Sequence, residues 1–160
     1  MRPALPRVLF PLLLASSALA VDVMYGNPRF DYWVNVPGDL GALRPPDNGN
    51  GQSWVSGDGL VRVAAWGSYG PGVFDAPSVS AWAAYTERQE VASGSRVTYR
   101  RLLPGAFVLS GYQRDGRIFY QRVLVRDGTE AAVRVMYPEA RRGVWDARTA
   151  RIAASLRWGL

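Results

Sequence analysis

The chain of 160 residues contains no cysteine, no histidine and no lysine. Without histidine, the serine–histidine and cysteine–histidine nucleophile pairs are excluded, together with the usual imidazole-ligated zinc and copper sites. Without cysteine or lysine there is no disulfide, no thiolate and no Schiff base. Carboxylate chemistry is the common catalytic device that remains. We therefore expect a protein that is not an enzyme and that carries no cofactor.

Lysine is absent because all 19 basic residues are arginine; they stand against 13 acidic residues, so the formal net charge is +6. This excess is mild. It permits binding to anionic polymers, such as nucleic acid or acidic glycans, but does not require it.

The first twenty residues have the pattern of a cleaved secretory signal. Arg2 and Arg7 give a basic start, residues 8–15 are an almost unbroken apolar run, and small residues lead up to Ala20. This order predicts export and cleavage after Ala20. A membrane-spanning helix needs about 20 predominantly apolar residues. Because this run is shorter and contains Pro11, we expect no transmembrane segment in the mature chain.

Removal of the signal leaves residues 21–160, which we expect to form a single domain. A chain of this size buries roughly two thirds of its unfolded surface, so it needs neither disulfides nor a structural metal. Loss of Arg2 and Arg7 leaves 17 arginines and 13 acids, a net charge of +4. A secreted chain without cysteine points to a bacterial envelope, either in the periplasm or outside the cell.

Hydrophobic periodicity and turn residues predict strands that come in runs rather than alternating with helices. After a lead-in at 21–27, we expect strands at 30–36, 52–55 and 60–66, with a loop at 40–51. Ser78 is expected to cap a helix that runs to about Ala92. Asp146 is expected to cap a last helix at 147–157. Between the two helices, four further strands are predicted at 96–102, 106–112, 117–126 and 129–137.

This order predicts an α+β domain with a mostly antiparallel sheet of about six to seven strands, packed by two helices. The last four strands form a meander whose turns predict its register. The Asp127-Gly128 turn places Tyr120 opposite Val135, and carrying the next turn back places Leu109 opposite Tyr120. One face is then apolar enough to carry both helices, with Phe107, Leu109, Ile118, Tyr120, Leu124, Ala131, Val133, Val135 and Tyr137.

The opposite face of the predicted meander mixes polar and apolar side chains, Glu130 among them. Aromatic rings beside guanidinium groups are how strand surfaces hold single-stranded nucleic acid. An alternative, which we favour, is a second hydrophobic layer covered by the loops around Leu40 and Val73, because a secreted protein meets little nucleic acid. Nucleic acid is therefore not the expected partner. The candidate binding residues on this face are Tyr112, Arg117, Phe119 and Arg134.

The segment 47–51 (Asp-Asn-Gly-Asn-Gly) is similar to the start of a calcium loop, with Asp58 at the twelfth place. An EF-hand needs oxygen ligands at the third and fifth places, which are Gly49 and Gly51 here. We therefore expect no metal site, and turn formation explains these residues.

Several short motifs follow one another in a characteristic order along the mature chain. They are the strand at 30–37, the segment 45–51, the Ser-Gly-Asp-Gly turn at 56–59, Val97-Thr98-Tyr99, the segment 108–111, Ile118-Phe119-Tyr120 and Tyr137-Pro138. Their order resembles a group of secreted bacterial domains of uncharacterised function. More distantly, the layout is similar to the Mog1/PsbP fold, an antiparallel sheet between helices used for binding and assembly. The resemblance implies this fold and no particular activity.

Three hypotheses for function follow. The leading one is an exported, monomeric, non-catalytic protein of the envelope or periplasm that binds a protein or a cell-wall component. The second is a carboxylate-based glycan hydrolase, which needs two acids about 5 to 10 Å apart across a cleft. The third is a module that binds anionic polymers.

Overall fold

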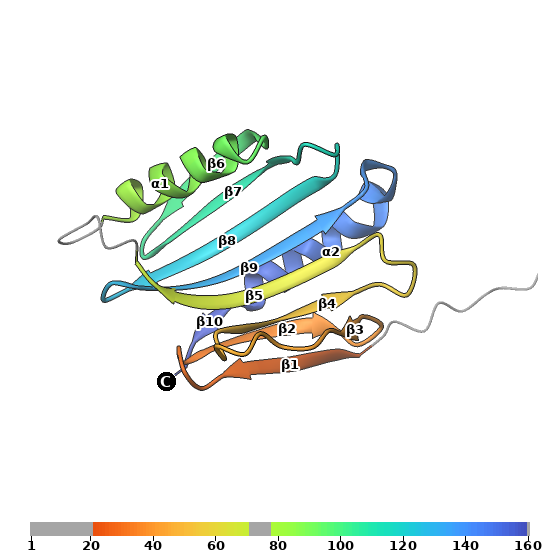
Figure 1. The fold of residues 1–160 in the computed structure, drawn as a ribbon, viewed down its shortest axis with the longest axis horizontal. Coiled ribbons are helices and arrows are strands. Elements are labelled where there is room, and N and C mark those ends of the chain that lie inside the picture. Colours follow the sequence, from red (N-terminus) through yellow and green to blue (C-terminus); the bar gives the residue numbers. More distant parts are fainter. Residues whose placement is uncertain (1–20, 71–77, 160) are drawn as a thin grey trace, which may run out of the picture.

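The structure is a computed structural model that describes residues 21–70 and 78–159. The predicted signal at 1–20 and the loop position Val73 lie outside the described residues. Within them the chain forms ten strands, two α-helices and one 3-10 helix (Figure 1). In chain order these are β1 (Asp22–Asn27), β2 (Tyr32–Pro37), β3 (Gly41–Ala42), β4 (Gly51–Val55), β5 (Arg62–Tyr69), α1 (Val79–Ala92), β6 (Arg96–Leu103), β7 (Ala106–Tyr112), β8 (Ile118–Arg126), β9 (Thr129–Tyr137), η1 (Glu139–Arg141), α2 (Arg142–Ser155) and β10 (Arg157–Trp158).

The strands form two antiparallel sheets. Seven strands lie in the order β3-β4-β5-β9-β8-β7-β6, and three lie in the order β1-β2-β10. The predicted α+β fold, with a mainly antiparallel sheet and two helices, is confirmed. The additional strands are short or terminal: the predicted lead-in is β1, which pairs with β2, and β10 pairs with the other edge of β2.

The two helices cover opposite faces of the seven-stranded sheet. We call the face that packs against α2 and the three-stranded sheet the closed face; its core includes Val133 and Val135 together with Trp145 and Ile152 of α2. We call the face covered by α1 the open face; α1 packs there against β6 and β7 (Figure 1). The open-face core comprises Trp82, Ala83, Phe107, Leu109, Phe119, Val123 and Ala132.

The register between β8 and β9 agrees with the prediction, and Tyr120 lies opposite Val135. Asp127 and Gly128 form the connecting turn with φ values of 49° and 72°. Left-handed backbone at both central positions is what a two-residue hairpin turn requires, because its twist matches that of the strands.

The register between β7 and β8 differs from the prediction by one residue. Leu109 lies opposite Gln121 rather than Tyr120. The amide of Gln113 donates to the carbonyl of Arg117 (2.8 Å), so the loop contains three residues rather than four. Gly116, with φ 83°, supplies the left-handed position of such a loop.

This slip reverses the side chains of β7, because neighbouring residues of a strand point to opposite faces. Phe107 and Leu109 therefore lie under α1, whereas Tyr112 lies on the closed face. The prediction that both helices share one face is wrong for the same reason. Each face of the sheet carries one helix.

The first helix begins as predicted and the second does not. Ser78 accepts a hydrogen bond from the amide of Ala81 (3.1 Å) and caps α1. In contrast, α2 begins at Arg142, directly after η1, instead of after Asp146. Asp146 lies within the helix and accepts a hydrogen bond from the Tyr137 hydroxyl (2.6 Å), so its carboxylate joins α2 to β9.

Candidate functional site

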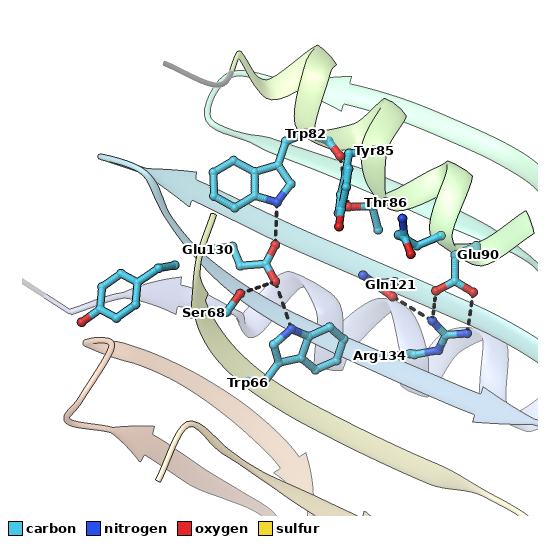
Figure 2. Close-up of a pocket in the computed structure, with 11 residues that line it drawn as sticks. Trp66, Ser68, Trp82, Tyr85, Thr86, Glu90, Gln121, Glu130 and Arg134 are labelled. Carbon is cyan, nitrogen blue, oxygen red and sulfur yellow. Dashed lines mark hydrogen bonds and ion pairs between the residues drawn. The ribbon is translucent and has the colours of Figure 1, made fainter. Parts of the chain in front are cut away.

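A pocket lies on the open face where α1 faces β5 and β9. Its volume is about 370 Å³, near the lower end of the range of roughly 300 to 1,000 Å³ seen for small-molecule sites. Side chains from four elements converge on it (Figure 2). They are Trp82, Tyr85, Thr86, Gln89 and Glu90 of α1, Trp66, Ser68 and Tyr69 of β5, Gln121 of β8, and Glu130 and Arg134 of β9.

The carboxylate of Glu130 organises one end of the pocket. Its Oε1 accepts hydrogen bonds from the indole N–H of Trp66 (3.1 Å) and the hydroxyl of Ser68 (2.9 Å). Its Oε2 accepts one from the indole N–H of Trp82 (2.7 Å). Three neutral donors from β5 and α1 therefore hold one carboxylate of β9 in a fixed position (Figure 2).

Strand pairing and a helix start bring these four side chains together. In the β5–β9 pair, Ser68 lies opposite Glu130. Trp66 lies two residues before Ser68 and so projects from the same face. Trp82 comes from the first turns of α1, whose position is set by the Ser78 cap. The cluster thus depends on three segments that are separate in sequence.

An ion pair occupies the other end of the pocket. The guanidinium of Arg134 donates to both oxygens of Glu90, with Nη2 at 3.0 Å from Oε2. It also donates to the amide oxygen of Gln121 (3.0 Å) and lies over the ring of Phe119, 4.5 Å from its centroid. The side chains of Arg134 and Glu90 are only 14% and 12% exposed. Bidentate pairing of this kind fixes geometry as well as charge.

Two carboxylates, Glu90 and Glu130, therefore line one pocket, as the hydrolase hypothesis requires. Both oxygens of each already accept hydrogen bonds. The structure shows both groups as hydrogen-bond acceptors, whereas glycoside hydrolysis needs one carboxyl group to donate a proton to the leaving group. Among the described residues, no group of three or more acidic side chains is placed to hold a metal ion.

The four residues predicted to form a binding surface do not lie together. Phe119 and Arg134 share the open face, but the Phe119 ring is fully buried and cannot stack on a base. Tyr112 lies on the closed face, where its hydroxyl donates to Glu139 (3.2 Å). Arg117 lies at the β7–β8 loop and is paired with the nearby Asp115 (2.8 Å).

Glu130 lies on the face of the sheet that the sequence predicted, but the residues that donate to its carboxylate were not predicted. Trp66 and Ser68 at alternate positions of one strand were the available signal, since they mark a polar and aromatic stripe. The missing information was the partner strand, because β5 pairs with β9 across some 60 residues of intervening chain. Trp82 lies within the helix predicted after Ser78, and no role was predicted for it.

The architecture and pocket together define an α+β domain of the Mog1/PsbP-like class. The fold is similar to the solution structure of the cyanobacterial PsbP protein CyanoP of Synechocystis sp. PCC 6803, with a TM-score of 0.63 at 12% identity over 89% of this chain and 95% of that one. It is also similar to the Ran-binding protein Mog1p of Saccharomyces cerevisiae, with a TM-score of 0.54 at 12% identity over 87% of this chain and 96% of that one.

At this identity the similarity concerns the fold alone. No protein-family model matches the chain, and no curated protein matches its sequence significantly. Across residues 21–70 and 78–159, no helix has the length and apolar composition needed to cross a bilayer.

Proposed function

We propose that the chain is an exported, non-catalytic binding protein of the bacterial envelope that holds its partner at the open-face pocket. The pattern of the first twenty residues supports export. The observation that carries the proposal is the pocket itself, in which hydrogen bonds from one strand and one helix position one carboxylate among aromatic rings. The partner is an envelope protein or a cell-wall component, and the chain acts as a monomer.

Two further features support binding over catalysis. The chain has no histidine, cysteine or lysine to serve as a conventional base or nucleophile. Both carboxylates of the pocket already accept hydrogen bonds from side chains of the chain itself. A rigid, hydrogen-bonded anion is suited to recognition.

Capture from envelope extract tests the proposal. The full chain, tagged at its carboxyl terminus, should retain one or a few partners at micromolar concentration. Glu130→Gln should lose them, whereas Glu87→Gln should not, because Glu87 pairs with Arg100 outside the pocket. Retention that is the same for all three proteins would contradict the proposal. Sequencing the amino terminus of the exported product should give Val21 if cleavage follows Ala20.

A carboxylate-based glycan hydrolase remains the second candidate, because Glu90 and Glu130 share one pocket. It predicts release of reducing ends from cell-wall glycan, abolished by Glu130→Gln. Substrate left intact after prolonged incubation with folded wild-type protein would remove this candidate.

A further inference from the structure

The charge of Glu130 has no counter-charge within the described part of the chain. The pocket contains three charged side chains, Glu90, Glu130 and Arg134. Arg134 is engaged bidentately by Glu90. The nine ion pairs formed by the described residues do not include Glu130. A chain with an excess of arginine thus leaves one net negative charge in this pocket.

Neutral donors orient this carboxylate but do not neutralise it. Two indole N–H groups and one hydroxyl donate to Glu130, and its partly buried position removes part of its hydration. A charge that is taken partly out of water without a cation is costly. A purely structural link between α1 and β5 could be made by a neutral side chain at this position. The retained charge therefore indicates a cation that arrives from outside the chain.

The surrounding side chains select the kind of cation. Trp66, Tyr69 and Tyr85 place aromatic rings around the pocket, and ring faces attract organic cations. The ring of Trp82 is buried, and this residue contributes its indole N–H. A metal ion would instead require several oxygen ligands, and the described residues contain no such cluster. A pocket of about 370 Å³ suits a group with few heavy atoms.

We propose that the open-face pocket binds a compact alkylammonium group, held by the Glu130 carboxylate and by the rings of Trp66 and Tyr85. This assignment rests on the proposed function, because it names the chemistry recognised at the same pocket. The group has two sources: a free amine, or an amino group carried by a larger partner. In both cases the ammonium lies against the carboxylate, and its carbon atoms contact the rings.

Calorimetric titration of the full chain with choline and with 3,3-dimethylbutan-1-ol tests the charge requirement. The two probes share one shape, but only choline is a cation. Choline should bind about tenfold more tightly than the alcohol, a difference that the carboxylate and the ring faces together can supply. Sodium chloride at equal ionic strength is the control for screening. Equal binding of the two probes, or binding of neither, would overturn the assignment.

Variants locate the site. Glu130→Gln preserves shape and removes the charge, so it should weaken choline binding about tenfold. Glu87→Gln, on the same helix but outside the pocket, where Glu87 pairs with Arg100, should leave binding unchanged. Unchanged choline binding in Glu130→Gln would overturn the site. If circular dichroism shows that Glu130→Gln does not fold, Trp66→Leu replaces it, since this variant keeps the carboxylate, loses one ring and should bind choline several-fold more weakly.

A lysine probe separates the two sources. If Nα-acetyl-lysine amide binds as tightly as choline, the ammonium belongs to a larger partner. If choline binds more tightly, the ligand is a free amine. Failure here is distinguishable from failure of the proposed function. One outcome would be that envelope partners bind the wild type and not Glu130→Gln, while no ammonium probe binds. This outcome would overturn the ammonium assignment and would still support the proposed binding function.

Discussion

The two faces of the seven-stranded sheet are covered by different elements. The closed face meets α2 and a second sheet, and its strands contribute a buried apolar layer that includes Val63, Val133 and Val135. Its charged residue Arg122 reaches the Ala153 carbonyl near the end of α2 (2.9 Å), where the helix dipole favours a cation. The open face is covered by α1 over β6 and β7, and beside β5 and β9 it keeps an ion pair and an uncompensated carboxylate. Both faces thus contain a buried core, and the open face also keeps a pocket lined by charged side chains.

Truncation of a closed-face tryptophan should produce the largest effect. Trp145 of α2 is 4% exposed and packs beside the Tyr137 ring. Trp145→Ala should lower the free energy of unfolding by about 3 to 5 kcal/mol, because it leaves a cavity in the core. Urea denaturation measures this loss. Val144, its neighbour on the same helix, is 62% exposed, and Val144→Ala should change stability by no more than about 0.5 kcal/mol. Similar costs for the two variants would contradict the closed-face core.

Breaking the ion pair of the open face should cost less. Arg134→Met leaves Glu90 nearly buried without its partner and should destabilise the fold by about 2 to 4 kcal/mol. The double variant Glu90→Leu/Arg134→Met should recover much of that loss. A double-mutant cycle in urea reports the coupling between the two sites. Arg44→Met is the control: it removes an ion pair whose two side chains are 87% and 92% exposed, and should be near neutral. Additive single effects would show that the pair is not coupled.

Removal of one indole donor should have a smaller effect again. Trp66→Phe keeps an aromatic ring in the pocket but deletes the N–H that donates to Glu130. Loss of a buried hydrogen bond to a charged group lowers the free energy of unfolding by about 1.5 to 3 kcal/mol. Because this pocket is partly open, we expect a decrease of about 1 kcal/mol. Thermal unfolding measures the change, and a loss as large as that of Trp145→Ala would place this residue in the core rather than in a site.

The smallest predicted effect is a pH dependence at the β4–β5 turn, outside both faces. The Ser56 hydroxyl, the Leu60 amide and Arg141 all donate to Asp58 and lower its pKa to about 2. A lowered pKa stabilises the fold above the unfolded value, 3.8, and this contribution disappears as pH falls from about 4 to 2. Asp58→Asn should therefore have a lower free energy of unfolding than the wild type at pH 7, and nearly the same free energy of unfolding at pH 2. Ser56→Ala, which removes the first donor, should give part of the same change; a pH-independent difference would contradict this account.

Local features of the fold were predictable because their causes lie within a few residues. The Ser78 cap and the Asp127-Gly128 turn are examples, since each is formed by a side chain or backbone preference that short sequence contains. The β7–β8 register was missed because three- and four-residue loops both fit Gln113–Gly116 by composition. Only the left-handed Gly116 and the Gln113–Arg117 pairing distinguish them.

The site was predictable only in part because it is assembled from distant segments. Glu130 and Arg134 share one face because they lie four residues apart on β9, which is a local cause. Trp66 and Trp82 reach Glu130 through strand pairing and helix docking, which short-range periodicity does not encode. From the sequence alone, each tryptophan is equally compatible with a place in the core. Its indole N–H indicates a role only when the structure shows an acceptor beside it.

The position of β2 has a consequence for the order of assembly. It pairs with β1 on one side and with β10 on the other, and the Asn35 amide donates to the Ser155 hydroxyl, 120 residues away (2.8 Å). Contacts this distant are slow to form, because a long loop must close first. A chain delivered amino terminus first can pair β1 with β2, but it cannot complete the small sheet until Arg157 and Trp158 arrive. Completion of the three-stranded sheet therefore depends on contacts between residues at least 120 positions apart in sequence.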